Sequence, residues 1–434
     1  MFDKSIINGK VYINHAFIKT NIYLQGEKIA KISDEIYASK QVIDANHKMI
    51  IPGLIDPHTH MALDLKTIHS VDDFASGSIS GLYGGVTTII DFLEPTSCAS
   101  DLEKSFYSRL NEAKDCHCDY KFHATIKNPT GSLEEYVLKV KELGLTSIKL
   151  FTTYSNSNRR TYDADIIELL KLSQIHHILI LAHIENDDLI DLNPDFTYQD
   201  LPISRPSISE TKEALKLASF VKKYGGYLYM VHLSSGETLQ KLKEQYSDIL
   251  NKKFFVESCP QYFNLSNDLL KQENGYLYTM APPIRRKEEL VKLVSLFSDV
   301  YTIGTDHCSF MKKEKNHLLL KDIPLGIGGI ESSFHLMYHL FNVQAIDKMT
   351  LNPASIHHLL GKKGKIEEGY DADLVIYELA NSAIEKLHSK CDYSVYQGYP
   401  TDEIIKFVLL RGNIIIEDQN NMLIEGQFIK SEDY

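Results

Sequence analysis

Short apolar runs recur along the middle of the chain and alternate with longer segments whose apolar residues follow a helical period. The runs occupy residues 49–56, 87–92, 121–126, 147–152, 178–185, 227–234, 253–259 and 300–307. Residues 133–144 and 208–225 are examples of the helical segments between them. Alternating strands and helices are typical of parallel βα units, and nearly continuous apolar runs are typical of strands buried on both faces. Eight runs therefore predict an α/β protein with a closed (β/α)8 barrel, the TIM-barrel fold.

The two ends of the chain have a different, β-rich pattern. SIINGKVYIN carries a hairpin-like turn signal at Asn8-Gly9, and NIYLQGEKIAKIS has a similar signal at Gly26. The C-terminal segment contains the strand-like runs DADLVIYEL, IIKFVLLRGNIIIED and MLIEGQFI. We therefore expect residues 1–50 and 356–434 to pair into one small β domain, and residues 51–355 to form the barrel.

The charge balance argues against two classes of partner. The 434 residues include 46 Lys and Arg against 58 Asp and Glu, which gives a formal net charge of −12. A nucleic acid or an anionic membrane would require a basic face, so we expect neither as a partner. The densest basic run, Lys312-Lys313-Glu314-Lys315, is broken by an acid, and we expect it to be a solvated loop.

Cysteine usage and the N-terminus predict a cytoplasmic protein. The six cysteines form no CxxC pair, which favours reduced thiols over a disulfide framework or a zinc ribbon. The N-terminal stretch MFDKSIINGKVYIN lacks the basic and apolar regions of a signal peptide. No apolar run approaches the roughly 18 residues that span a bilayer.

Polar side chains follow several of the predicted barrel strands, at the end where the active sites of such barrels lie. They are His58, His60, Lys149, His183, His232 and Asp306. The spacing of His58 and His60 matches the strand period of two, so both imidazoles can point toward one ion. Imidazole nitrogens and carboxylate oxygens suit zinc and similar divalent metals. The joint pattern predicts a metal site at this end of the barrel.

Each of these residues also has a structural interpretation. A lone histidine beside a strand, such as His183 or His232, is more often hydrogen-bonded within the core. We expect His123 and His307 to be of this kind. Asp306 can serve as a turn residue or a helix cap instead of a ligand.

Lys149 has two interpretations that differ in burial. On a half-exposed strand it would face solvent as a charged ammonium, which cannot bind a metal. Buried in an apolar strand, it would have a depressed pKa that favours the neutral amine. A neutral amine can react with carbon dioxide to form a carbamate, which is an anionic oxygen ligand.

The order of several motifs resembles one family over nearly the whole chain. The motifs are GLIDPHTHM, SVDDFASGSISGLYGGVTTIIDF, SIKLFTTY, LAHIEN, VHLSSGET, VESCPQYFNL, APPIR, GTDHCSF, IPLGIGGIE and NPASIHHLLGKKGKIEEGYDADLVIYE. Together they resemble the cyclic amidohydrolases of the dihydropyrimidinase and hydantoinase group. The HxH motif alone is a moderately specific sign of this family, whereas the ordered set of motifs is highly specific for it. The resemblance implies that the two chain ends form a β-sandwich and that the protein is a homo-oligomer, a tetramer or a dimer.

The resemblance also implies a binuclear metal centre. The implied ligands are His58, His60 and Asp306 for the first metal, His183 and His232 for the second, and a carboxylated Lys149 bridging both. Zinc fits these ligands best, and manganese, cobalt and nickel also suit them.

The implied reaction is hydrolysis of a ring amide in a small cyclic ureide, a hydantoin or a dihydropyrimidine, to an N-carbamoyl amino acid. Two divalent metals supply an acidified water as the nucleophile. Asp306 takes the water proton and returns it to the leaving nitrogen. Tyr154, in KLFTTY, matches the family's tyrosine that hydrogen-bonds the substrate carbonyl and stabilises the oxyanion.

Two departures from the family pattern bear on the substrate. Ala281 and Leu325 stand where family members commonly have Ser and Asn. Those family positions contact the substrate ring largely through backbone groups, so we expect Ala281 and Leu325 to remain substrate-binding residues. The less polar pocket favours a 5-aryl-substituted hydantoin over a small dihydropyrimidine.

Specific residues argue against two of three alternative functions. Dihydroorotases usually place an Arg two residues after the second His, and Ala62 leaves no guanidinium there for a substrate carboxylate. An allantoinase-type cyclic amidohydrolase remains an alternative. A non-enzymatic scaffold relative would have lost metal ligands, whereas all six expected residues and Tyr154 are present here.

Overall fold

A closed parallel barrel forms the centre of the computed structural model, which describes residues 1–65, 68–385 and 387–431. Its strands, in chain order and in spatial order, are β6 (Leu54–Thr59), β7 (Val86–Phe92), β8 (Asp119–Thr125), β9 (Ser147–Phe151), β10 (Leu179–His183), β11 (Leu228–Leu233), β12 (Phe254–Ser258) and β13 (Thr302–Ile303). Every neighbouring pair is parallel. Just beyond β13, the Asp306 amide donates to the His58 carbonyl at 2.9 Å and closes the ring. The predicted (β/α)8 barrel is confirmed.

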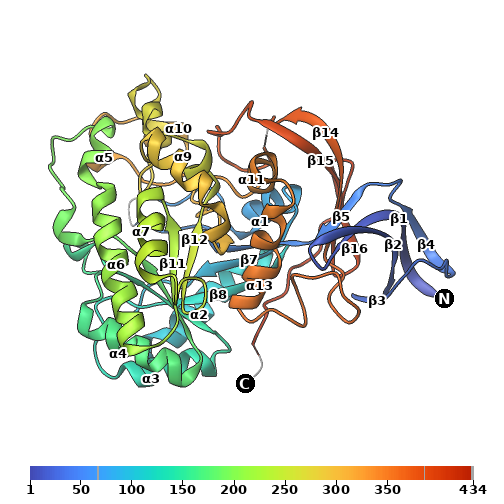
Figure 1. The fold of residues 1–434 in the computed structure, drawn as a ribbon, viewed down its shortest axis with the longest axis horizontal. Coiled ribbons are helices and arrows are strands. Elements are labelled where there is room, and N and C mark those ends of the chain that lie inside the picture. The colour runs from blue at the N-terminus through green and yellow to red at the C-terminus, as the bar shows by residue number, and fades with distance from the viewer. Residues whose placement is uncertain (66–67, 386, 432–434) are drawn as a thin grey trace.

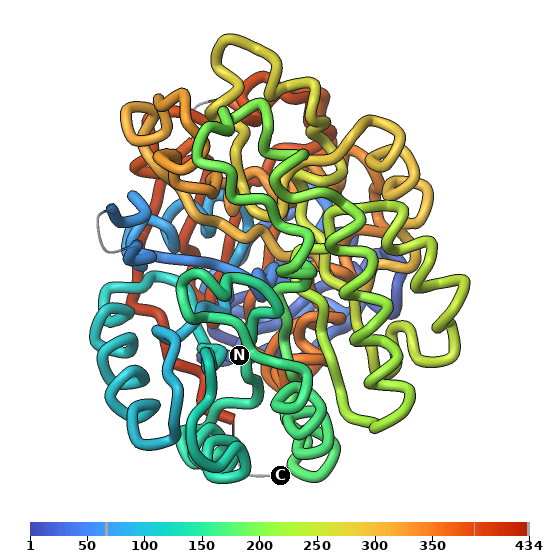
Figure 2. Tube along the Cα trace, turned by 90° about the vertical axis from the view of Figure 1, so that its left-hand side faces the viewer, coloured from blue at the N-terminus to red at the C-terminus, as the bar shows by residue number. Residues whose placement is uncertain are grey.

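Helices surround the barrel in the order of the chain (Figures 1 and 2). They are α1 (Phe74–Tyr83), α2 (Ala99–Glu112), α3 (Leu133–Glu142), α4 (Asp163–His176), α5 (Leu201–Ser204), α6 (Ser207–Tyr224), α7 (Gly236–Tyr246), α8 (Pro260–Asn264), α9 (Lys287–Ser295), α10 (Lys312–Lys315), α11 (Ser333–Phe341), α12 (Gln344–Met349) and α13 (Leu351–Ile356). Figure 2 shows α2, α3 and α4, cyan to green, side by side. The predicted helical segments correspond to α3 and α6. Ser132 begins α3 by accepting a hydrogen bond from the Glu135 amide, which satisfies a free donor of the first turn.

Both ends of the chain build one separate sheet beside the barrel (Figure 1). Its strands are β1 (Phe2–Ile13), β2 (Ala16–Gln25), β3 (Lys28–Ser33), β4 (Ser39–Asp44), β5 (Met49–Pro52), β14 (Leu374–Ala383), β15 (Pro400–Leu410), β16 (Asn413–Glu417) and β17 (Asn420–Asn421). The order is β17-β16-β15-β14-β5-β1-β2-β3, with β4 paired to β1. A second hydrophobic core fills this domain and includes Ile6, Ile22, Ile50 and Leu374. The second β domain is confirmed, and its limits at residues 50 and 356 remain a prediction.

Three expectations about individual strands are wrong. The run 49–56 is two strands, because Gly53 separates β5 of the terminal sheet from β6 of the barrel. A Cβ on Gly53 would lie 2.2 Å from Thr87 Oγ1, so only glycine fits at this crossing. Asn8-Gly9 is a bulge inside β1, opposite Asn21, and the hairpin turn lies later, at residues 14–15. MLIEGQFI forms no strand of this sheet and instead bonds to Tyr120 of the barrel.

A buried lysine joins the two domains. Lys363 Nζ lies 2.5 Å from Asp119 Oδ2 at the start of β8, and 3.1 Å and 2.6 Å from Asp371 and Asp373 just before β14. Lys363 is 3% exposed. Removal of the ammonium would leave three carboxylates close together with little access to water.

Lys363→Met is therefore expected to lower the free energy of unfolding by about 3–5 kcal/mol, the usual effect of breaking a buried ion pair. Chemical denaturation followed by circular dichroism measures the change. Lys365→Met is the control, because the side chains of Lys365 and its partner Glu367 are 40% and 57% exposed. Equal destabilisation by the two substitutions would contradict this role of Lys363.

Within the described part of the chain, no helix combines the length and the apolar composition needed to cross a membrane. All six cysteines are free thiols.

Candidate metal centre

Two histidines and an aspartate meet at the C-terminal end of the barrel. His58 belongs to β6, His60 follows it, and Asp306 follows β13. Asp306 Oδ1 lies 3.3 Å from His58 Nε2 and 3.1 Å from His60 Nε2, and the two Nε2 atoms are 3.3 Å apart. Across the described residues, no other group of three or more His, Cys, Asp or Glu side chains comes this close together. These three side chains can bind one divalent ion.

The other two predicted histidines stand beside this group. His183 ends β10 and His232 lies in β11, and their ring centroids are 4.6 Å apart. The His232 ring lies 5.3 Å from the His58 ring. Burial lowers the pKa of His58, His183 and His232. All three are therefore held as neutral imidazoles, the form that binds metals.

Lys149 lies inside the barrel on β9 and is 2% exposed, which excludes the solvent-facing interpretation. Its Nζ is 5.0 Å from the centroid of the Phe92 ring and 5.6 Å from that of the Phe151 ring. Burial lowers the pKa of Lys149 to about 8, although Asp306 and Glu257 oppose this shift. The neutral amine is therefore a far larger fraction near neutral pH than it is for an ordinary exposed lysine.

Asp306 is held in the left-handed region of the backbone, with φ 53°. Such a conformation is uncommon for a non-glycine residue and is often found at functional sites. Burial alone would raise the pKa of Asp306, but the neighbouring His58, His60 and Lys149 outweigh burial and lower it. The carboxylate is therefore ionised at neutral pH.

Tyr154 borders the same group from the loop after β9. Its backbone is also left-handed, with φ 69°, and its ring centroid lies 5.2 Å from that of His183. Asp187 fixes the loop by accepting hydrogen bonds from the hydroxyl of Thr153 (2.9 Å) and from the amide of Ser155 (3.3 Å). Tyr154 is thus held near the histidines by anchors on both sides of it.

Ala281 and Leu325 are partly exposed and lie on two loops that Lys315 joins. Lys315 Nζ donates to the Thr279 carbonyl at 2.7 Å and to the Gly326 carbonyl at 2.5 Å. Lys315 is 0% exposed, so the prediction of a solvated loop is wrong for this residue. These two carbonyl acceptors explain its burial, which charge counting along the chain could not foresee.

His123 and His307 are hydrogen-bonded within the core, as expected. His123 pairs with Ser147 Oγ at 2.6 Å and with the Pro57 carbonyl at 3.0 Å. His307 Nε2 lies 3.1 Å from Asp72 Oδ2, and its Nδ1 accepts from the amides of residues 329 and 330.

Glu257 is a site residue that the sequence reasoning missed. Its Oε1 lies 2.6 Å from His58 Nδ1 and accepts the His232 amide at 2.9 Å, while its Oε2 accepts the Tyr229 hydroxyl at 2.8 Å. A carboxylate on the far nitrogen of a metal-binding histidine fixes its tautomer and ring orientation. Burial raises the pKa of Glu257 to about 7. The sequence signal that could have identified Glu257 was the presence of an acid inside the apolar run 253–259.

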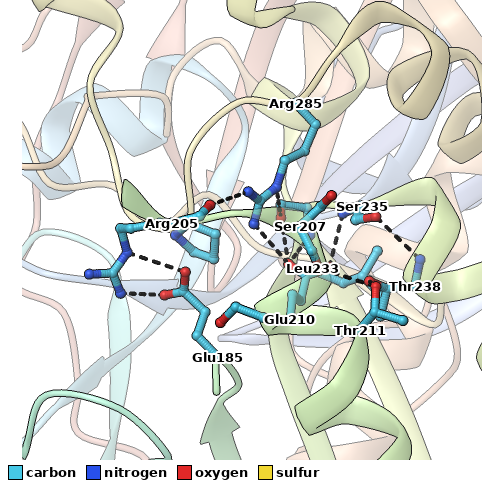
Figure 3. Close-up of polar contacts among 12 residues, drawn as sticks. Glu185, Arg205, Ser207, Glu210, Thr211, Leu233, Ser235, Thr238 and Arg285 are labelled. Carbon is cyan, nitrogen blue, oxygen red and sulfur yellow. Dashed lines mark hydrogen bonds and ion pairs between the residues drawn. The ribbon is translucent and has the colours of Figure 1, made fainter. Parts of the chain in front are cut away.

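A buried ion pair between Glu185 and Arg205 was also missed (Figure 3). Glu185 Oε2 lies 2.6 Å from His183 Nε2, so this acid orients a second histidine. Arg205 comes from the long segment between β10 and α6. No local sequence pattern indicates that this residue lies at the site.

The barrel and the candidate metal site at its strand ends are those expected of a metal-dependent hydrolase. Residues 49–415 match the model of the amidohydrolase family, and the chain belongs to that family. Within the family it groups with the hydantoinases and dihydropyrimidinases.

Three relatives illustrate this similarity. A D-hydantoinase of Geobacillus stearothermophilus is 30% identical over 99% of this chain and 97% of its own. A dihydropyrimidinase of Arabidopsis thaliana is 28% identical over 95% of this chain and 81% of its own. The solved structure of a D-hydantoinase (dihydropyrimidinase) from a Thermus species superposes with a TM-score of 0.92 at 26% identity, covering 99% of both chains.

The family implies a pair of divalent metal ions, and the donor set here fits them. The three buried histidines are neutral and Asp306 is ionised. Glu257 and Glu185 each hold the far side of one histidine. Such outer carboxylates are typical of metal-binding histidines.

Proposed function

We propose that this chain is a cyclic amidohydrolase that opens the ring of a hydantoin or a dihydropyrimidine and yields an N-carbamoyl amino acid. The observation that carries the proposal is the convergence of His58, His60, His183, His232, Lys149 and Asp306 on one end of the barrel. The names of the relatives, D-hydantoinase and dihydropyrimidinase, support this substrate class over allantoin and over a non-enzymatic scaffold.

The proposed centre holds two divalent metals, with zinc favoured and manganese, cobalt or nickel as alternatives. His58, His60 and Asp306 would hold one metal, and His183 and His232 the other. When bound, such a pair supplies an acidified water and polarises the ring carbonyl.

We propose that Lys149 is carboxylated and bridges the metals. Its Nζ would form an N–C bond with carbon dioxide and release one proton, which requires the neutral amine. The buried, aromatic surroundings of Lys149 support this form.

Lys149→Ala is expected to lose bound metal, because the bridging oxygens disappear. A short carboxylic acid added to the protein should restore metal binding, measured by elemental analysis after gel filtration. Retention of full metal content by Lys149→Ala would exclude the bridging role.

Two side chains would carry the proton and the charge of the reaction. An Asp306 carboxylate oxygen accepts the proton of the attacking water and delivers it to the ring nitrogen that leaves. The Tyr154 hydroxyl donates a hydrogen bond to the carbonyl oxygen as negative charge develops there. Asp306 is ionised, as a proton acceptor must be.

The pocket wall favours an apolar substituent on the substrate. Ala281 and Leu325 are proposed to bind the ring through backbone groups, and neither side chain adds a hydrogen-bonding group. We expect a higher kcat/KM for phenylhydantoin than for dihydrouracil. A panel of phenylhydantoin, hydantoin, dihydrouracil, dihydroorotate and allantoin, with product identified by mass spectrometry, tests both the reaction and this preference. A strong preference for dihydrouracil would overturn the substituent argument.

We further propose that the protein is cytoplasmic and forms a homo-oligomer, a tetramer or a dimer. Light scattering after gel filtration would test the oligomeric state.

A further inference from the structure

A single buried carboxylate connects two residues of the proposed site. Glu185 is 0% exposed and lies two residues beyond β10. Its Oε1 accepts from Arg205 Nε at 3.2 Å, and its Oε2 accepts from both Arg205 Nη2 and His183 Nε2. Figure 3 shows the guanidinium of Arg205 facing this carboxylate edge to edge. Planar two-point pairing of this kind fixes the orientation of an arginine more tightly than a single contact would.

The same guanidinium also contacts the aromatic ring of Tyr154. Arg205 Cζ lies 4.9 Å from the centroid of that ring, within the range of a cation–π contact. The His183 ring lies 5.2 Å from the same centroid. The Tyr154 ring therefore contacts both the guanidinium of Arg205 and the imidazole of His183.

The backbone of Arg205 is fixed by a second buried arginine (Figure 3). Arg285 Nη1 donates to the Arg205 carbonyl at 2.6 Å, and Arg285 Nε donates to Ser234 Oγ at 2.9 Å. Ser234 follows β11, and its amide donates to Glu210 at 3.0 Å. The loop that carries Arg205 is therefore held against the strand end that carries His232.

We propose that Arg205 is a positioning residue for the reaction. Held by Glu185, its guanidinium fixes the Tyr154 phenol beside His183, where the substrate carbonyl develops its charge. The inference rests on the proposed function for its catalytic consequence, while the contact between Arg205 and Tyr154 stands without it. A purely structural ion pair would contribute to folding alone and would leave Tyr154 unaffected.

A double-mutant cycle separates these roles. Arg205→Lys keeps a positive charge beside Glu185, so we expect the fold to be retained. The substitution removes the planar fork of the guanidinium. We expect kcat on phenylhydantoin to fall about tenfold, less than the 10²–10³ that the loss of an oxyanion donor costs. KM and metal content should change little. In the Tyr154→Phe background, Arg205→Lys should have almost no further effect, because coupled residues are not additive. Arg286→Lys is the control, because Arg286 is 71% exposed.

A second readout does not depend on activity. In metal-free protein labelled with [13C]tyrosine, the signal absent from Tyr154→Phe identifies Tyr154. Arg205→Lys should move that signal, and Arg286→Lys should not. Failure of the wild-type enzyme to open any ring would refute the proposed function while this spectrum still decides the positioning role. An unmoved Tyr154 signal, or additive losses in the cycle, would overturn the inference.

Discussion

Asp306→Asn is expected to lower kcat on phenylhydantoin by about 10²–10⁴, the range attributed to a positioned general acid–base. The amide keeps the shape of the side chain and one oxygen atom, but it cannot take a proton from water at neutral pH. Metal content should stay largely unchanged, because the four histidines and Lys149 remain. Steady-state kinetics and elemental analysis on the same preparation measure the two effects.

Asp188→Asn is the matched control for this substitution. Asp188 lies near the site loops, but its side chain is 80% exposed. Near-normal turnover by Asp306→Asn at full metal content would rule out Asp306 as the proton carrier. Loss of metal together with activity would instead assign Asp306 a role as ligand only.

Tyr154→Phe is expected to lower kcat by about 10²–10³, because the oxyanion loses one preorganised donor. The phenyl ring keeps the contacts with His183 and Arg205, so the loop and the metal content should be preserved. The effect should appear in kcat more than in KM, since the hydrogen bond strengthens as the negative charge develops.

Tyr162→Phe provides the control, because Tyr162 is 51% exposed and lies further along the same loop. A kcat for Tyr154→Phe within twofold to threefold of the wild-type value would exclude the tyrosine as the oxyanion donor.

The sequence predicted the barrel because its physical signal is repeated. Buried parallel strands need apolar residues on both faces, and each predicted run contains all or part of a barrel strand. The strand ends were equally readable, because the spacing of His58 and His60 follows directly from the strand period. The division of the run 49–56 into two strands at Gly53 and the bulge at Asn8 could not be predicted from the sequence. Both depend on which neighbour lies opposite, Thr87 in one case and Asn21 in the other.

The residues that hold the site were harder to predict than those proposed to bind metal. Glu257 contacts His58 from a distant part of the chain, and Glu185 contacts His183 two residues before it. An isolated acid in an apolar run does not show which histidine it will contact. Arg205 and Lys315 lie in long connecting segments, where charged residues usually face solvent. Their burial follows from carboxylate or carbonyl acceptors that only the folded chain brings together.

The dependence of phenylhydantoin ring opening on bound metal tests the central claim most directly. Metal-free protein would be titrated with Zn²⁺, and the N-carbamoyl product would be measured at each ratio of zinc to chain. The proposed binuclear centre predicts negligible product without metal and a rate that rises to a plateau at about two ions per chain. No ring-opened product at full metal loading, or an undiminished rate in metal-free protein, would contradict it.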